Sequence, residues 1–362
     1  MDVALFDYEL PPERIASVPS DRRDGSKLMV FDRASGVLSH HVFSELPGLL
    51  LARTRLVRNV VDVLRARVPG RRPTGGAVEC LLLRPTEKPD EWLCLLRPGK
   101  KAADSAGFGI PGEYHARVVA QVGAEYRVKF SVEGGRDVAT MAERVGSLPL
   151  PPYIERAREE GRDYAALDNE RYRTVFADRT KRTAAAAPTA GLHFTPEVLA
   201  ALGARGFTFH DLTLNVGLGT FKPIEVERVE DHPIHREEYH IPGATAAALA
   251  DRSAGPRLAV GTTALRAGED FMRKRAAGKM TADAFGEYSG EADIYVYPPD
   301  NFMSADMLLT NFHLPRSTLL CLVSAFLAPG TTEGIAIFKR LYADAIAKDY
   351  RFYSYGDAML IL

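Results

Sequence analysis

The sequence has few cysteines, no excess of charge of either sign and no long apolar run. Its three cysteines, Cys80, Cys94 and Cys321, lie far apart and form no CxxC pair, which excludes a disulfide framework and a zinc ribbon. Lys and Arg (46) balance Asp and Glu (47), giving a net charge of −1. This balance excludes a globally basic nucleic-acid binder but allows a local basic patch. With no stretch of 18 apolar residues and no basic-then-apolar leader, we expect a cytoplasmic protein without a membrane partner.

Several common ligand-binding motifs are also missing. There is no GxxxxGK[ST] loop, no HExxH, and only the first half of a GxGxxG motif at Gly217-Leu218-Gly219. His232 and His235 have a metal-like spacing, but Pro233 breaks the helix that such a pair needs. We therefore expect no metal, no P-loop nucleotide site and no permanently bound dinucleotide.

The 362 residues suggest two domains at about 150 residues each. Short alternating apolar runs separated by Gly or Pro fill the segment from about 68 to 145, a pattern typical of an antiparallel sheet or small barrel. After the proline-rich stretch 148–152, helical and strand patterns alternate. The predicted fold is an α/β domain built from residues 1–67 and 151–362, with a small antiparallel β-barrel inserted at 68–150.

Within the α/β domain, Thr195 is a suitable N-cap for a helix over 196–205, and a strand is predicted over 208–216. Pro11-Pro12 and Pro315 each suit the first turn of a helix. The remaining predicted elements are helices at 244–252 and 263–276, a buried strand at 258–260 and a buried strand at the C-terminus.

The candidate binding and catalytic residues lie in polar loops that contain glycine. His193 stands between Gly191 and the N-cap of a helix, whose free amides attract an anion or carboxylate. The same spacing fits a capped helix start with a packed histidine equally well. Segments 215–221 and 261–266 each follow a strand, so they point to the carboxyl edge of a sheet, where ligands bind.

Taken in order along the chain, these segments resemble a known family. The matching text includes Phe6-Asp7-Tyr8-Glu9-Leu10-Pro11, Arg72-Pro73-Thr74-Gly75-Gly76, Pro188 to Thr195, Asn311 to Thr318 and Tyr355 to Met359. The chain resembles the S-adenosylmethionine:tRNA ribosyltransferase-isomerases of queuosine biosynthesis over nearly its whole length. The resemblance implies the same architecture of an α/β domain with an inserted barrel.

The resemblance also implies the reaction. The ribosyl part of S-adenosylmethionine, a co-substrate, is transferred to 7-aminomethyl-7-deazaguanine in tRNA and isomerised to give epoxyqueuosine, with release of adenine and methionine. His193 and His313 are the expected proton-transfer groups, and Glu238 or Asp357 would balance the sulfonium charge. The expected binding residues are Thr74, Gly75, Gly76, Thr189, Gly191, Gly217, Gly219, Thr220, Glu238, Gly261, Thr262, Thr263, Arg266, Asn311, Arg316, Tyr355 and Asp357.

One departure from the family keeps alternatives open. After Asn59, the usual Asp-Thr-Arg triplet is replaced by Val60, Val61 and Asp62. A non-catalytic tRNA-binding paralogue is therefore an alternative. A second alternative is an enzyme that acts on S-adenosylmethionine without RNA.

Arginines are concentrated between Arg53 and Arg72. Four of them, Arg65, Arg67, Arg71 and Arg72, are predicted to contact tRNA phosphates, although a solvated basic face would have the same sequence. Arg179, Lys181 and Arg182 form a second, shorter basic stretch.

Overall fold

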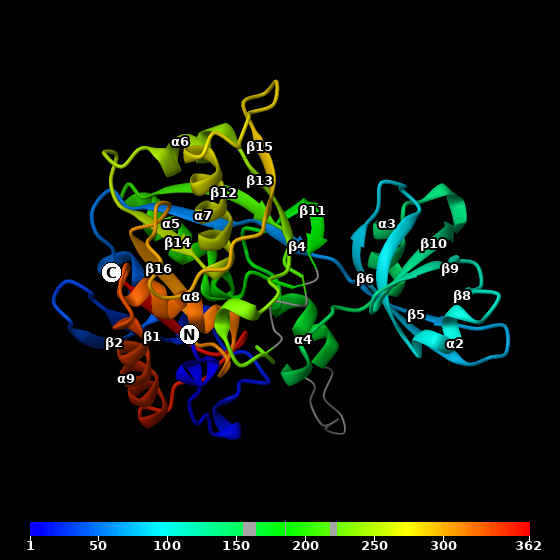
Figure 1. Cartoon of the computed structure of the whole chain (residues 1–362), viewed down its shortest axis with the longest axis horizontal. Helices are drawn as coiled ribbons and strands as arrows, with labels where there is room; N and C mark the ends of the chain where they lie inside the picture. Colours follow the sequence, from blue (N-terminus) through cyan, green and yellow to red (C-terminus); the bar gives the residue numbers. More distant parts are fainter. Residues whose placement is uncertain (155–163, 185, 218–222) are drawn as a thin grey trace. The chain divides into compact units, whose positions relative to one another are not determined.

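The structure is a computed structural model that describes residues 1–154, 164–184, 186–217 and 223–362. The chain divides into two compact units (Figure 1). The first unit comprises Met1–Val61, Pro152–Ala177 and Pro188–Leu362, and the second comprises Asp62–Pro151 and Asp178–Ala187. The predicted fold class, an α/β unit plus an inserted antiparallel barrel, is confirmed.

A nine-stranded sheet forms the centre of the first unit, in the order β15-β13-β12-β3-β14-β16-β17-β1-β2. The neighbouring strands β12, β3, β14 and β16 are parallel, whereas β17 runs antiparallel to β16, and β1 is parallel to β17. The outer strands β13, β15 and β2 each pair antiparallel with their neighbours. The bounds are β1 (Lys27–Phe31), β2 (Leu38–Val42), β3 (Arg55–Asn59), β12 (Thr208–Leu214), β13 (Glu237–Ile241), β14 (Arg257–Val260), β15 (Tyr288–Ala292), β16 (Met307–Asn311) and β17 (Ala358–Ile361).

Helices cover both faces of this sheet, because the central strands are apolar on both sides. Adjacent strand residues point to opposite faces, so Leu308 packs in one core cluster and Leu309 in another. The first cluster takes residues from α7 (Thr262–Ala276), α8 (Thr318–Leu327) and α9 (Gly334–Ala347), and the second from α1 (Leu46–Leu49) and α5 (Pro196–Ala204). The other helices of this unit are α4 (Tyr164–Arg171) and α6 (Gly243–Ala250).

Some element boundaries differ from the predictions. Thr195 caps α5 as predicted, accepting a hydrogen bond from the Val198 amide. Pro315, by contrast, does not begin a helix: Ser317 caps α8 instead, because its hydroxyl accepts from the Leu320 amide. Pro12 begins only a three-residue 3₁₀ turn. The 3₁₀ helices are η1 (Val3–Phe6), η2 (Pro12–Arg14), η3 (Arg23–Gly25), η4 (Phe43–Glu45), η5 (Glu133–Gly135), η6 (Pro152–Ile154), η7 (Thr189–His193) and η9 (Val229–Asp231).

The second unit is a closed barrel of six antiparallel strands in the order β10-β7-β6-β5-β8-β9 (cyan in Figure 1). Its interior holds Trp92, Phe108, Phe130 and the buried thiols Cys80 and Cys94. The strands are β5 (Arg67–Arg71), β6 (Ala77–Pro85), β7 (Glu91–Arg97), β8 (Phe108–Ile110), β9 (Tyr114–Val122) and β10 (Glu125–Val132), with helices α2 (Gly99–Ala103) and α3 (Val138–Val145). Strands β4 (Val61–Val63) and β11 (Asp178–Ala184) form a separate two-stranded sheet. No described helix is both long enough and apolar enough to cross a membrane.

Candidate active site

The carboxyl ends of the four parallel strands meet at one edge of the large sheet. Loops that follow β3, β12, β14 and β16 therefore share this edge with the starts of β13, β17 and β1. Ligands of open α/β sheets bind at this edge. The motifs predicted from the sequence around His193, Gly217, Gly261 and Asn311 all belong to it.

A hydrogen-bonded chain holds His193 at this edge. The Thr189 hydroxyl donates to Oδ1 of Asn311 at 2.9 Å, and Nδ2 of Asn311 lies 3.3 Å from Nε2 of His193. Nδ2 also donates to the carbonyl oxygen of Tyr353 at 3.2 Å, which fixes the orientation of the amide. Tyr353 has a φ of +73°, an uncommon conformation for a residue with a side chain.

This network sets the tautomer of His193. Because Asn311 presents an N–H to Nε2, that nitrogen is the acceptor and Nδ1 carries the proton. The Phe43 ring stacks on the imidazole with centroids 5.1 Å apart. Burial, and then the nearby Arg351 and Arg23, lower the pKa of His193 to about 3. The imidazole is therefore neutral at pH 7, and it lines a hollow together with Arg23, Arg171 and Tyr355.

His313 lies on the other face of the sheet. Its Nε2 is 2.9 Å from the hydroxyl of Thr310, whereas His193 contacts Asn311, the next residue of β16. Adjacent strand residues point to opposite faces, so the two histidines do not face each other. Burial lowers the pKa of His313 to about 3, and its main-chain oxygen accepts from the Tyr8 hydroxyl. His313 lines none of the hollows formed by described residues.

A buried carboxylate organises the other side of the edge, but it is Glu237 rather than Glu238. Glu237 accepts a hydrogen bond from the Gly217 amide at 2.9 Å and pairs with the Arg266 guanidinium. The Glu238 side chain points to solvent, because neighbouring residues of β13 alternate between buried and exposed. Glu238, the residue predicted from the sequence, therefore lies on the opposite face of β13 from Glu237.

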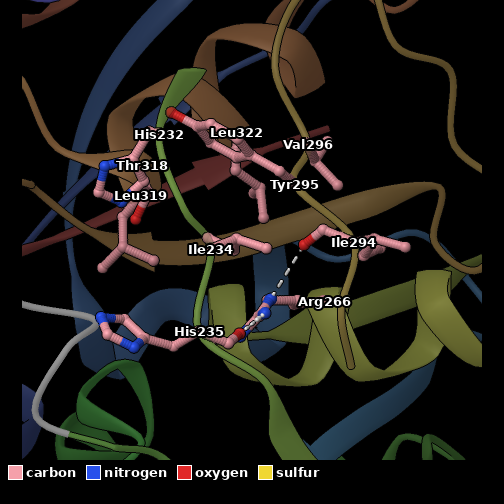
Figure 2. Close-up of a pocket in the computed structure, with 10 residues that line it drawn as sticks. All are labelled: His232, Ile234, His235, Arg266, Ile294, Tyr295, Val296, Thr318, Leu319 and Leu322. Carbon is pink, nitrogen blue, oxygen red and sulfur yellow. Dashed lines mark hydrogen bonds between the residues drawn. The ribbon is translucent and has the colours of Figure 1, made fainter. Parts of the chain in front are cut away.

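Arg266 borders a hollow that the sequence did not predict (Figure 2). Its guanidinium donates to the main-chain oxygens of His235, Ala292 and Ile294. Figure 2 shows His232 beside Thr318 and Leu319 at the start of α8, and His235 and Ile294 beside Arg266. The hollow is mostly apolar. Such a lining suits a weakly polar group rather than an ion. The only signal in the sequence was the spacing of His232 and His235, which indicated a metal site and was set aside.

The Gly261 loop begins α7 at the same edge. Gly261 has a φ of +92°, which a residue with a side chain would adopt only with strain. Thr262 is buried, and Oγ1 of Thr263 is buried with no hydrogen-bond partner among the described residues. Gly191 is required for close packing, since a Cβ there would lie 2.7 Å from the Phe176 ring.

The Asp357 carboxylate is bound by two main-chain amides and lies 3.7 Å from the Arg351 guanidinium. Its oxygens accept hydrogen bonds from the amides of Lys27 at 2.9 Å and Arg351 at 2.7 Å, and burial raises its pKa. It therefore joins the starts of β1 and β17. The Tyr355 hydroxyl donates to Asp168 at 2.9 Å, and the Arg316 side chain is exposed. Gly219 and Thr220 lie outside the described residues.

Three predicted binding residues and the four predicted RNA-binding arginines belong to the barrel unit. Thr74, Gly75 and Gly76 form the turn between β5 and β6, where Arg71 donates to the Gly75 oxygen at 3.1 Å. The Arg65 guanidinium donates to the main-chain oxygen of Glu143 at 3.4 Å, and Nη1 of Arg67 lies 3.5 Å from the Glu79 carboxylate. Arg71 and Arg72, by contrast, have no carboxylate partner among the described residues. The arginine run also divides between the units, because Arg53, Arg55 and Arg58 belong to the first.

Comparisons with known proteins agree with this architecture. Residues 3–361 match the family model described as "Queuosine biosynthesis protein". The chain is 44% identical over 364 residues to the S-adenosylmethionine:tRNA ribosyltransferase-isomerase of Citrifermentans bemidjiense and 43% identical over 365 residues to that of Trichlorobacter lovleyi, with 100% of each chain covered. The crystal structure of the S-adenosylmethionine tRNA ribosyltransferase from Thermotoga maritima is similar with a TM-score of 0.52 and 31% identity, covering 99% of this chain and 100% of that one. The chain therefore belongs to the queuosine biosynthesis protein family and is, like these relatives, a transferase and isomerase.

Proposed function

We propose that this enzyme transfers the ribosyl group of S-adenosylmethionine to 7-aminomethyl-7-deazaguanine in tRNA. The ribose is isomerised in the process to give epoxyqueuosine, and adenine and methionine are released. Relatives that carry this activity in their names match the chain over its full length. S-adenosylmethionine is consumed, so it is a co-substrate rather than a bound cofactor.

The hydrogen-bonded chain from Thr189 through Asn311 to His193 is the observation that supports this proposal most directly. The reaction needs proton transfer and a site that excludes water around a cationic substrate. A neutral imidazole adds no positive charge that would repel the sulfonium. With Nε2 held by Asn311, Nδ1–H is the donor that remains for a substrate atom, and no described residue hydrogen-bonds it.

Release of adenine in the presence of tRNA that carries the deazaguanine base tests this role. We expect His193→Ala to slow adenine release by about a hundredfold or more, the range for loss of a proton-transfer group. His313→Asn is the matched control, since His313 is also buried and lines none of the hollows formed by described residues. A folded His193→Ala protein with unchanged turnover would contradict the proposed role.

A non-catalytic tRNA-binding paralogue is the second candidate, and the segment after Asn59 supports it. Val60 and Val61 are buried where the family has polar residues, and the Val61 amide donates to Oδ1 of Asn59. The same assay separates the possibilities. Binding of tRNA without adenine release would support the paralogue, and release without tRNA would support an enzyme that has lost its RNA substrate.

A further inference from the structure

Two arginines line the hollow beside His193. Arg23 comes from η3 and Arg171 from the end of α4, far apart in the sequence. They are close enough for the charge of Arg171 to lower the pKa of Arg23, after the larger effect of burial. The hollow therefore holds two neighbouring cations next to a neutral imidazole.

Neither arginine forms an ion pair with a carboxylate among the described residues. Arg23 donates to the main-chain oxygens of Arg171, Leu192 and Glu170, and Arg171 donates to those of Ser20 and Asp21. Carbonyl oxygens satisfy some of the N–H groups but do not neutralise the charge. Buried charges in proteins are normally paired, and within the part of the chain that the structure describes this pair of cations has no counter-ion.

Three acidic residues near the two arginines that the structure describes are engaged elsewhere or exposed. Asp24 pairs with Arg22 at 3.1 Å, and Asp168 accepts from the Tyr355 hydroxyl. Glu170 attracts Arg23 less strongly than Arg171 repels it, and its side chain is exposed. In addition, Nε of Arg171 is buried and has no hydrogen-bond partner among the described residues, in a residue that is only 9% exposed. Within that part of the chain, one buried N–H donor is therefore unused.

The geometry points to a carboxylate-binding subsite formed by Arg23 and Arg171, which takes the amino-acid end of S-adenosylmethionine. This assignment rests on the proposed function. Guanidinium groups bind planar carboxylates through paired N–H donors. The hollow is bounded by Leu192, His193 and Tyr355 beside the two guanidinium groups. A phosphodiester would bring the RNA chain on both sides, whereas a terminal carboxylate ends at the two arginines, so we assign the site to a carboxylate.

Calorimetry with two sulfonium ligands tests the subsite: S-adenosylmethionine and its decarboxylated analogue, which keeps the sulfonium and the nucleoside. We expect the wild-type enzyme to bind the decarboxylated ligand at least tenfold more weakly, the range for lost hydrogen bonds to a charged group. Arg171→Gln should weaken S-adenosylmethionine binding by a similar factor and remove the preference between the two ligands. Arg171→Lys keeps the positive charge and should restore part of the preference, which a purely structural role would not produce.

Arg22→Gln is the matched control, because Arg22 is exposed, adjacent in sequence and paired with Asp24. It should keep the wild-type preference. Equal wild-type affinity for both ligands, or an intact preference in folded Arg171→Gln and Arg23→Gln, would overturn the subsite and leave the proposed function standing. Weaker tRNA binding in Arg171→Gln with the preference intact would also overturn it, since that result indicates a phosphate site. A wild-type enzyme that binds neither sulfonium would instead contradict the proposed function.

Discussion

The two buried histidines should make the first unit sensitive to mild acid. His193 and His313 each have a pKa near 3 in the folded protein and about 6.5 when unfolded. Below pH 6.5 the unfolded chain binds protons that the folded protein excludes, so stability is full above this pH and falls as the pH decreases towards 3. Between pH 7 and pH 5, linkage predicts a loss of about 2 kcal/mol for each histidine, or about 4 kcal/mol for both.

Urea unfolding at pH 7, 6 and 5 measures this loss, with far-UV circular dichroism reporting on the whole chain. Trp92 is the single tryptophan and lies inside the barrel, so its fluorescence follows the second unit separately. In His193→Gln, the loss between pH 7 and pH 5 should be about 2 kcal/mol smaller than in the wild type. The Trp92 transition should have the same pH dependence in both proteins.

Comparing the pH dependence within each protein removes any constant cost of the substitution. An identical loss in His193→Gln and the wild type would refute the reasoning. Titration of a His193 resonance near pH 6.5 in the folded protein would refute it as well, because the ring would then be protonated without unfolding.

Two further predictions concern the carboxylate beside Arg266 and the arginines of the barrel. Glu237→Gln should destabilise the first unit by about 3 kcal/mol, because it leaves Arg266 buried without its charge partner. Glu238→Gln on the same strand should change stability by less than about 0.5 kcal/mol. Equal urea midpoints for the two variants would contradict this prediction. Replacing Arg71 and Arg72 together by Ala should weaken tRNA binding and reduce the salt slope by up to about two, near 0.7–0.9 for each lost phosphate contact. The single change Arg67→Ala should have a smaller effect on the salt slope for each arginine removed, because Arg67 already pairs with Glu79. A wild-type salt slope in the Arg71 and Arg72 variant would show that these two residues form a solvated face.

The sequence predicted the fold well where local patterns determine the elements. Short apolar runs such as 77–83 and 92–96, bounded by Gly or Pro, form strands of the barrel. Thr195 caps a helix, because its hydroxyl accepts a hydrogen bond from an amide of the first turn. The start of α8 was wrong because two residues compete for it. Pro315 suits a first helical turn, but Ser317 supplies the side-chain acceptor that the free amide of Leu320 needs.

The site was less predictable, because its contacts join distant parts of the chain. Asp357 accepts from Lys27, which is 330 positions away, and no local pattern reveals that such a carboxylate is already occupied. The choice between Glu237 and Glu238 depends on which face of β13 is buried, and this is set by pairing with β12 and β15. Arg171 was missed for the same reason, since only the fold brings it next to Arg23 and His193.

The alternation along β16 restricts how the reaction can use its histidines. Thr310 holds His313 on the face that carries Tyr342, and Asn311 holds His193 on the face that carries Phe43. A reaction with two proton transfers therefore cannot use these rings as a facing acid and base pair. Because His193 is also neutral, with Nε2 bound to Asn311, it can supply one hydrogen-bond donor without adding charge. In the proposed reaction, the second proton transfer would then involve another group at the carboxyl edge or an atom of the substrates themselves, such as the amine that would accept the ribosyl group.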